Sequence, residues 1–262
     1  MSSYKLHSLF GLVLGSLFFQ NPLAIYLSLV SSNIPDNDHK FRKDNVYKLI
    51  IAGLLIFIVL YILKLPYYLG ILLCILGLIF YFSSHRGFTH SLLGIVILGF
   101  LIFSIIKLGS NILLSLGLFG NYQYSYYLSI LVFIILLSIF SLNHRLVLPS
   151  ILIFSGLFYL FPNIYLNDYI LLFSIVIGLF SHIILDSFTS SGVKVLYPLS
   201  GRKFYKKFGI VSLIIIMMLA ILIYNGFLLP LISFLFKIDL SLFIIKFHNL
   251  MFWTFFILFS IF

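Results

Sequence analysis

The sequence predicts an all-α protein embedded in a membrane, and its composition and the length of its apolar runs are the observations that predict this. Hydrophobic residues make up 63% of the 262 residues and charged residues 8%, whereas soluble domains have about 45–50% and about 25%. Lipid must cover this much apolar surface, and each main run approaches the roughly 17–25 residues of a spanning helix. We expect one polytopic domain, 1–262, with about eight transmembrane helices, and an interfacial turn at 111–119. The expected spans are 46–63, 67–83, 88–107, 126–142, 146–161, 167–185, 208–229 and 242–262.

The N-terminal apolar runs are different, because 6–19 and 23–34 are each too short to cross. Runs of about 10–14 residues are more often re-entrant or interfacial. The polar and helix-breaking sequence Gln20-Asn21-Pro22 separates them. We therefore expect a re-entrant or interfacial helical hairpin that turns at this break. The alternative is a single kinked span.

The basic residues predict which loops face the cytoplasm. Positively charged loops tend to stay on that side. If residues 36–45 are cytoplasmic and each later run crosses once, the loops 84–87, 143–145 and 186–207 are cytoplasmic as well. Together these four loops hold most of the 16 Lys and Arg residues. The net charge of +10 then reflects topology and attraction to anionic membrane lipid. We expect membrane lipid as a partner and no nucleic acid.

The few residues that could carry out chemistry are distributed unevenly. There are seven His and six acidic residues, and every acidic residue is Asp. Most of them lie in short segments that the predicted sidedness places at the cytoplasmic face. They are His7, Asp36, Asp38, His39, His85, His90, His182 and Asp186. Of these, His85 and His90 lie in the segment "SSHRGFTHSLLG". We interpret Asp44 as a solvated counterion, and His144 and His248 as interfacial residues.

Two spacings suggest that these residues meet. His182 and Asp186 are four residues apart, which places them on one face of a helix. His7 and Asp36 are symmetric about the break at residues 20–22, so a hairpin that closes there brings them side by side. Such a set of ionisable groups near a membrane is functional by default.

The segment "HRG" is expected to be a loop. His85 and His90 are five residues apart, which would separate them by about 140° on a helix. We therefore expect Thr89 to be an N-cap of the next span, with His90 in its first turn.

Imidazole nitrogens and carboxylate oxygens are the ligands that zinc, manganese or iron would take, and zinc suits hydrolysis. The sequence predicts one to three divalent ions. The predicted metal ligands are His7, Asp38, His39, His85, His90, His182 and Asp186. A cluster of ions can activate water and hold both oxygens of a phosphoester that is cleaved.

The remaining polar residues at this face are assigned to catalysis and substrate binding. We expect Asp36 to relay protons and Arg86 to hold the phosphate as a two-pronged donor. A phospholipid or other lipid-linked substrate is favoured by the location at the membrane surface. The predicted substrate-binding residues are Arg86, Thr89, Ser187, Thr189, Lys194 and Arg202.

These motifs resemble those of the YdjM family of membrane-bound, predicted metal-dependent hydrolases. The resemblance rests on His7, "PDNDH" at 35–39, "HRGFTHS" at 85–91, "SHIILDSFTSSGV" at 181–193 and "YPLSGRKF" at 197–204. It covers 1–205, and the helices expected within 208–262 carry no motif. It implies an inner-membrane location and metal-dependent hydrolysis, with no defined substrate.

Two further comparisons concern phosphoester chemistry. The order of the motifs resembles, more distantly, that of the zinc phospholipase C and single-strand nuclease group, which implies phosphodiester cleavage by a three-zinc cluster. The N-terminal amine that binds metal in that group has no match here, because Met1 precedes His7 by six residues. The chain also lacks the Lys-x6-Arg-Pro and Pro-Ser-Gly-His segments of type 2 phosphatidic acid phosphatases.

A different class of function is a non-catalytic metal-binding membrane protein, or an ion or metal transporter. A transporter needs ionisable groups near the middle of the bilayer. The predicted ligands instead gather at one face, which favours an enzyme or a structural metal site.

Overall fold

The computed structural model describes residues 4–119, 124–161 and 166–224. This part of the chain is all-α, as predicted, and outside its helices it forms one isolated bridge between Val193 and Phe204. The described helices are α1 (Tyr4–Phe18), α2 (Pro22–Ser31), α3 (Lys43–Ile62), α4 (Tyr68–Phe82), α5 (Leu92–Ser115), α6 (Ser125–Ser141), α7 (His144–Leu160), α8 (Asp168–Ser187) and α9 (Lys206–Tyr224). Short 3₁₀ turns are η1 (Pro35–Asp38), η2 (Lys40–Arg42) and η3 (Phe88–His90).

Four of the described helical segments are long and apolar enough to cross a membrane. They are Lys40–Ile62, Leu92–Ser115, Asp168–Ser187 and Lys206–Ile223. The helices α4, α6 and α7 are also apolar but have only 15 to 17 residues. The expected number of about eight spans is therefore not confirmed, and the run 242–262, with His248, lies outside the described residues.

The separate interfacial turn expected at 111–119 was wrong. Helix α5 continues without a break to Ser115, because no proline follows Lys107 to end the helix. The charge of Lys107 does not interrupt α5 either, since its ammonium group lies 2.7 Å from Asp168 Oδ1 at the start of α8.

The N-terminal hairpin is present. Helices α1 and α2 pack against each other, and Asn21 begins α2 by accepting hydrogen bonds from the backbone N–H groups of Leu23 and Ala24. Gly11 lies so close to Ser32 that a Cβ at Gly11 would come within 2.5 Å of Ser32 Cβ. This packing is that of a hairpin closed about residues 21 and 22, so the single kinked span is excluded.

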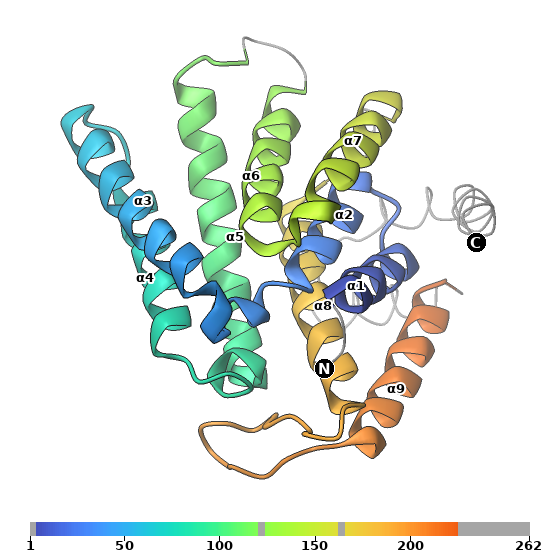
Figure 1. Ribbon diagram of the computed structural model, residues 1–262. Coiled ribbons are helices and arrows are strands. Elements are labelled where there is room, and N and C mark those ends of the chain that lie inside the picture. Colours follow the sequence, from blue (N-terminus) through green and yellow to red (C-terminus); the bar gives the residue numbers. More distant parts are fainter. Residues whose placement is uncertain (1–3, 120–123, 162–165, 225–262) are drawn as a thin grey trace, which may run out of the picture.

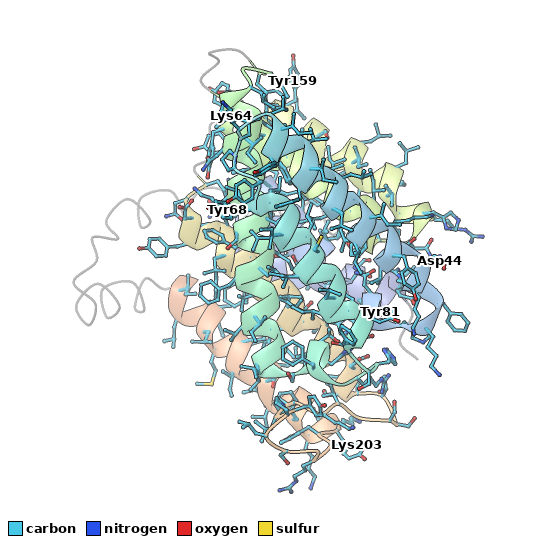
Figure 2. All side chains as sticks on the ribbon, turned by 90° about the vertical axis from the view of Figure 1, so that its left-hand side faces the viewer. Asp44, Lys64, Tyr68, Tyr81, Tyr159 and Lys203 are labelled. Atoms are coloured by element: carbon cyan, nitrogen blue, oxygen red, sulfur yellow. The ribbon has the colours of Figure 1, made fainter. Side chains whose placement is uncertain are left out.

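The hairpin lies inside the bundle rather than at its edge. Every residue of α2 is buried, and α2 contacts α1, α6, α7 and α8. Helices α3 and α4 form a paired arm at one flank (Figure 1). In the view of Figure 2, Lys64 and Tyr159 lie at one end of the molecule and Lys203 at the other. This separation agrees with the predicted sidedness, which places Lys64 outside and Lys203 inside.

Candidate metal centre

Four separate segments bring most of the predicted ligands together. His7 comes from α1, Asp36 and Asp38 from η1, His85 and His90 from the loop before α5 and from η3, and His182 and Asp186 from the last two turns of α8. Three overlapping groups among them could hold an ion, because one ligand atom from each residue lies within 4.8 Å of the others. These groups are His7, His182 and Asp186; Asp36, His90 and His182; and Asp38, His85 and His90.

The central position brings nitrogen and oxygen atoms to the spacing of metal ligands. The Nε2 atoms of His90 and His182 lie 3.0 Å apart. Asp36 Oδ1 is 3.6 Å from His90 Nε2 and 3.5 Å from His182 Nε2, and Asp186 Oδ2 is 3.5 Å from each. Zinc–ligand bonds of about 2.0–2.2 Å place the corners of a tetrahedron about 3.3–3.6 Å apart. The two imidazole nitrogens and the Asp36 oxygen could therefore hold one metal ion, and Asp186 Oδ2 lies at a similar distance from both nitrogens.

Contacts behind the central ligands fix their orientation. His182 Nδ1 is 2.7 Å from the backbone carbonyl oxygen of Ser32. A carbonyl can only accept, so Nδ1 carries the proton and Nε2 presents its lone pair to the centre. Orientation of a ligand imidazole by a carbonyl or carboxylate is typical of metal sites. The close packing of α2 against α8 thus prepares His182 as a ligand.

Asp38 has the corresponding position behind His90. Its Oδ2 atom is 3.4 Å from His90 Nδ1 and accepts a 2.5 Å hydrogen bond from Thr89 Oγ1. Its Oδ1 atom is 2.9 Å from His85 Nδ1. Burial by itself would raise the pKa of Asp38, but the hydrogen bonds with His85, His90 and Thr89 lower it to about 2. Asp38 is therefore a carboxylate that orients the imidazoles on either side of it.

The charges of the centre compensate one another. Burial opposes a charge on His90, but hydrogen bonds with Asp36 and Asp38 raise its pKa to about 10. Burial also opposes the charge of Asp36, yet His182 and His90 hold the pKa of Asp36 well below its usual range. Buried charges are tolerated only when they are paired in this way or bind a metal.

The two flanking positions are less complete than the central one. His7 Nε2 lies 3.6 Å from Asp186 Oδ1, and the His7 ring stacks on His182 with centroids 4.0 Å apart. His182 and His90 each turn Nε2 to the centre, so a second ion on the His7 side would share the carboxylate of Asp186. The third group has Asp38 Oδ1 and His85 in addition to His90. The three groups share His90 and His182, so the ligands form one continuous cluster.

Arg86 is held against α8 and the loop that follows it. Its backbone has a positive φ of 61°. One terminal nitrogen of the guanidinium donates to Thr189 Oγ1 (2.9 Å), Ser191 Oγ and the Gly192 carbonyl (3.1 Å), and the other lies 3.7 Å from Asp186 Oδ1. The sequence predicted that Arg86 would bind phosphate, and the structure places it beside the centre with part of its donor capacity already used.

Access to the centre is on the His85 side. The His85 side chain is 30% exposed and that of Arg86 15%, whereas the Asp36 side chain is 12% exposed and the other central ligands are 0–4% exposed. Among the candidate ligands that the structure describes, His85 therefore faces the surroundings most openly. A reactant of any size meets this residue first.

Three predictions about individual residues need correction. Thr89 is not the N-cap: η3 precedes α5, and Ser91 accepts the capping hydrogen bond from Gly94 N–H, which frees Thr89 to donate to Asp38. His39 lies outside the three groups, because its Nδ1 accepts from the Phe41 N–H. Asp36, expected as a proton relay, lies at ligand distance in the central position.

The predicted substrate-binding residues are only partly brought together. Thr189 contacts Arg86, as described above. Ser187 is buried and donates to the Ile184 carbonyl, Lys194 lies over the Tyr197 ring at 5.9 Å, and the backbone N–H of Arg202 donates to Ser200 Oγ. Sequence reasoning missed the role of Ser32, because a backbone carbonyl leaves no signal in the residue type.

Comparison with known proteins gives a family but no close relative. No curated protein and no solved structure matches the chain. The family model described as YdjM inner membrane protein matches residues 1–146 and again residues 125–261. Together these matches cover the segments that build the centre as well as the C-terminal region. The chain belongs to the family of YdjM inner membrane proteins.

Proposed function

We propose that this protein is a metal-dependent hydrolase that cleaves a phosphoester at the cytoplasmic face of the membrane, with zinc as the favoured metal and a lipid-linked substrate. The observation that carries the proposal is the set of two imidazole nitrogens with a carboxylate oxygen of Asp36 and one of Asp186 within 3.6 Å of them, next to an exposed histidine and an arginine. A zinc ion in such a site supplies a Lewis acid and a water of lowered pKa.

The residues of the chain divide the remaining tasks. His90, His182, Asp36 and Asp186 would hold the ion, while the Ser32 carbonyl and Asp38 keep the two imidazoles in the required orientation. Arg86 would stabilise the negative charge of a phosphate beside Asp186. His85, paired with Asp38 and exposed, is placed to exchange a proton with a leaving group.

A second candidate function follows from the number of central ligands. Structural zinc sites have four protein ligands, whereas catalytic sites usually keep one position open. Four protein atoms surround the central position here, so a metal that only stabilises the fold is the competing proposal. The exposed edge at His85 favours the enzyme, because it gives water or a substrate a way to reach the centre.

The test separates metal binding from hydrolysis. Protein purified in detergent is analysed for bound metal and assayed with p-nitrophenyl phosphate and bis(p-nitrophenyl) phosphate, before and after chelation and zinc re-addition. Asp186→Asn is compared with Asp168→Asn, which makes the same change at the other end of α8, where the side chain is 54% exposed.

We expect Asp186→Asn to lose metal and hydrolysis by about 10–100-fold, and Asp168→Asn to retain both. Both variants should insert, because removal of a charge lowers the cost of membrane insertion. Bound metal without hydrolysis of either ester would favour the structural site, and no bound metal would exclude both functions.

A further inference from the structure

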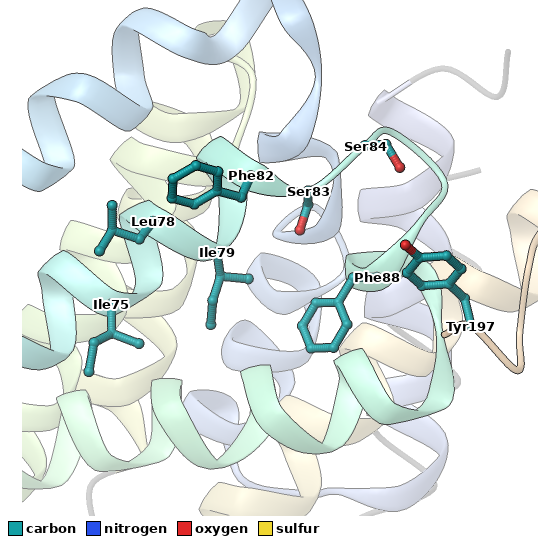
Figure 3. A pocket seen from close by; sticks show the side chains of 8 residues that line it. All are labelled: Ile75, Leu78, Ile79, Phe82, Ser83, Ser84, Phe88 and Tyr197. Carbon is teal, nitrogen blue, oxygen red and sulfur yellow. The ribbon is translucent and has the colours of Figure 1, made fainter. Parts of the chain in front are cut away.

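An apolar groove runs beside the exposed edge of the metal centre. It has a volume of about 580 Å³ and is lined by Ile75, Leu78, Ile79, Phe82, Ser83, Ser84, Phe88 and Tyr197. Ligand pockets usually have volumes of about 300–1,000 Å³. Figure 3 shows the aliphatic side chains along α4, with Phe88 and Tyr197 further along the groove, near Ser84.

The two ends of the groove have different chemistry. One end is formed by α4 side chains that are exposed on the outside of the bundle, where lipid would surround them, such as Ile75 and Leu78. The other end has Ser83 and Ser84, which directly precede His85 and Arg86. Phe88 in the wall is followed at once by Thr89 and His90 of the centre. The groove therefore extends from an apolar surface to residues that are neighbours of His85, Arg86 and His90 in the chain.

Charge at this end suits an anionic headgroup. Arg86 lies next to the groove in the chain, and the Lys194 ammonium group lies 5.9 Å from the ring of Tyr197, which itself lines the groove. The lining residues carry no acidic side chain, so nothing in the wall would repel a phosphate. An amphiphile with an apolar tail and a phosphate head fits both ends.

We infer that this groove holds the hydrocarbon chain of a phosphate-bearing membrane lipid and directs its phosphate to His85 and Arg86. The inference rests on the proposed function and gives its substrate a binding position. A lipid gains little hydrophobic free energy by moving from the bilayer into an apolar groove. The groove therefore acts by positioning the chain and so raises the fraction of lipids whose phosphate lies at the centre.

The experiment uses two lipid probes that have the same photoactivatable diazirine in the acyl chain. One is a phosphonate analogue of phosphatidic acid, which cannot be hydrolysed, and the other is diacylglycerol, which lacks the phosphate. The full-length protein is labelled in phosphatidylcholine nanodiscs, and mass spectrometry locates the labelled residues. We expect the phosphonate to label residues 75–88 at least fivefold more than diacylglycerol does.

A matched pair of variants tests whether the hydrocarbon chain of the lipid lies in the groove. Leu78→Trp fills the groove, and Leu152→Trp makes the same change on an exposed face of α7, away from the groove. Leu78→Trp should lower phosphonate labelling of 75–88 at least threefold, while Leu152→Trp should leave it unchanged. The metal content of both variants reports whether the centre is intact.

Equal labelling by the two probes would mean that the groove contains ordinary surrounding lipid, and the inference would fall. The inference would also fall if Leu78→Trp kept its metal and its residues 75–88 were labelled by the phosphonate as strongly as those of the parent. Hydrolysis of p-nitrophenyl phosphate, a soluble ester without an acyl chain, tests the proposed function independently of the groove. Hydrolysis of this ester without selective labelling would contradict only the inference about the groove. Selective labelling without hydrolysis of any ester would contradict only the proposed hydrolase activity.

Discussion

Two helix contacts in this protein, α3 with α4 and α2 with α8, are both extensive but are built from different groups. In the α3–α4 arm the close contacts are mainly apolar: Gly70 approaches the backbone of Phe57, and the buried residues of α3 are Val46, Gly53 and Leu60. The Cys74 thiol adds a weak hydrogen bond to the Ile50 carbonyl at 3.6 Å. Most of the outer face of α3 is exposed. Small residues that allow backbones to approach are typical of helix contacts in lipid.

The α2–α8 contact adds hydrogen bonds to close packing. Ser28 Oγ donates to the Ser174 carbonyl at 2.9 Å, and His182 Nδ1 donates to the Ser32 carbonyl at 2.7 Å. Every residue of α2 is buried. The comparison teaches that the bundle places its short, buried hydrogen bonds where a ligand must be held rigidly, and relies mainly on apolar packing where lipid is the neighbour. The variants below test this difference.

The largest effect is expected for Gly178→Leu in α8. A Cβ at Gly178 would collide with the Ser28 carbonyl oxygen and come within 2.7 Å of Ser31 Cβ. The larger side chain must push α8 away from α2, which moves His182 away from the Ser32 carbonyl. We expect bound metal to be lost and thermal stability to fall, since overpacking costs about 1–3 kcal/mol or more.

The control for Gly178→Leu is Gly156→Leu in α7, where a Cβ would meet nothing within 4 Å. Metal analysis and thermal unfolding in detergent measure both variants. If Gly178→Leu kept its metal and its stability, the α2–α8 contact would not be what holds His182 in place.

The second effect concerns Asp38, which orients His85 and His90 from behind. Asp38→Asn keeps the shape of the side chain but replaces one accepting oxygen by a donor. It can therefore no longer face Thr89 and His90 with one accepting oxygen and His85 with the other. We expect zinc affinity to fall about 10–100-fold, as for other groups that orient ligands. Competition with a zinc-binding dye measures this affinity.

Asp44→Asn is the control for Asp38, because Asp44 is exposed at the start of α3. Its zinc affinity should equal that of the parent. Equal affinities for Asp38→Asn and the parent would show that His90 keeps its orientation without the carboxylate.

A smaller effect on the centre is expected from the arm. In Gly70→Leu, a Cβ would lie 2.5 Å from the backbone nitrogen of Phe57, so α3 and α4 must separate. Unfolding should occur at a lower temperature, but bound metal should remain near the parent level, because neither helix supplies a central ligand. Loss of metal together with this destabilisation would show that the arm and the centre form one cooperative unit.

The sequence predicted the apolar helices and the convergence of the ligands for a simple reason. In a chain with so few ionisable residues, each His or Asp near a helix end is a strong signal. The prediction that His7 approaches the η1 carboxylates came from symmetry about the break. The structure brings His7 to the same cluster, where it lies beside Asp186. The number of spans could not be fixed, because runs of 15 to 17 residues lie at the lower limit of spanning length.

The details of the centre depended on contacts that the sequence does not display. A 3₁₀ turn of three residues shifts the start of α5 to Leu92. Ser91 therefore caps the helix, and Thr89 donates to Asp38 instead. The metal position of Asp36 depends on how η1 turns after Pro35. Arg86 was expected to be free for phosphate, but its partners Thr189, Ser191 and Gly192 lie more than a hundred residues further along the chain.

The smallest effect is expected far from the centre, at the ion pair that joins α5 to α8. Lys107 lies 2.7 Å from Asp168 and 2.8 Å from the Tyr126 hydroxyl, and the two charged side chains are 27% and 54% exposed. Exposed ion pairs contribute about 0–1 kcal/mol. Lys107→Met keeps the length of the apolar stem, so we expect thermal unfolding to change by only a few degrees and bound metal to stay at the parent level. If Lys107→Met released metal, the two ends of α8 would be coupled, and rigid holding of ligands would not be confined to the α2–α8 contact.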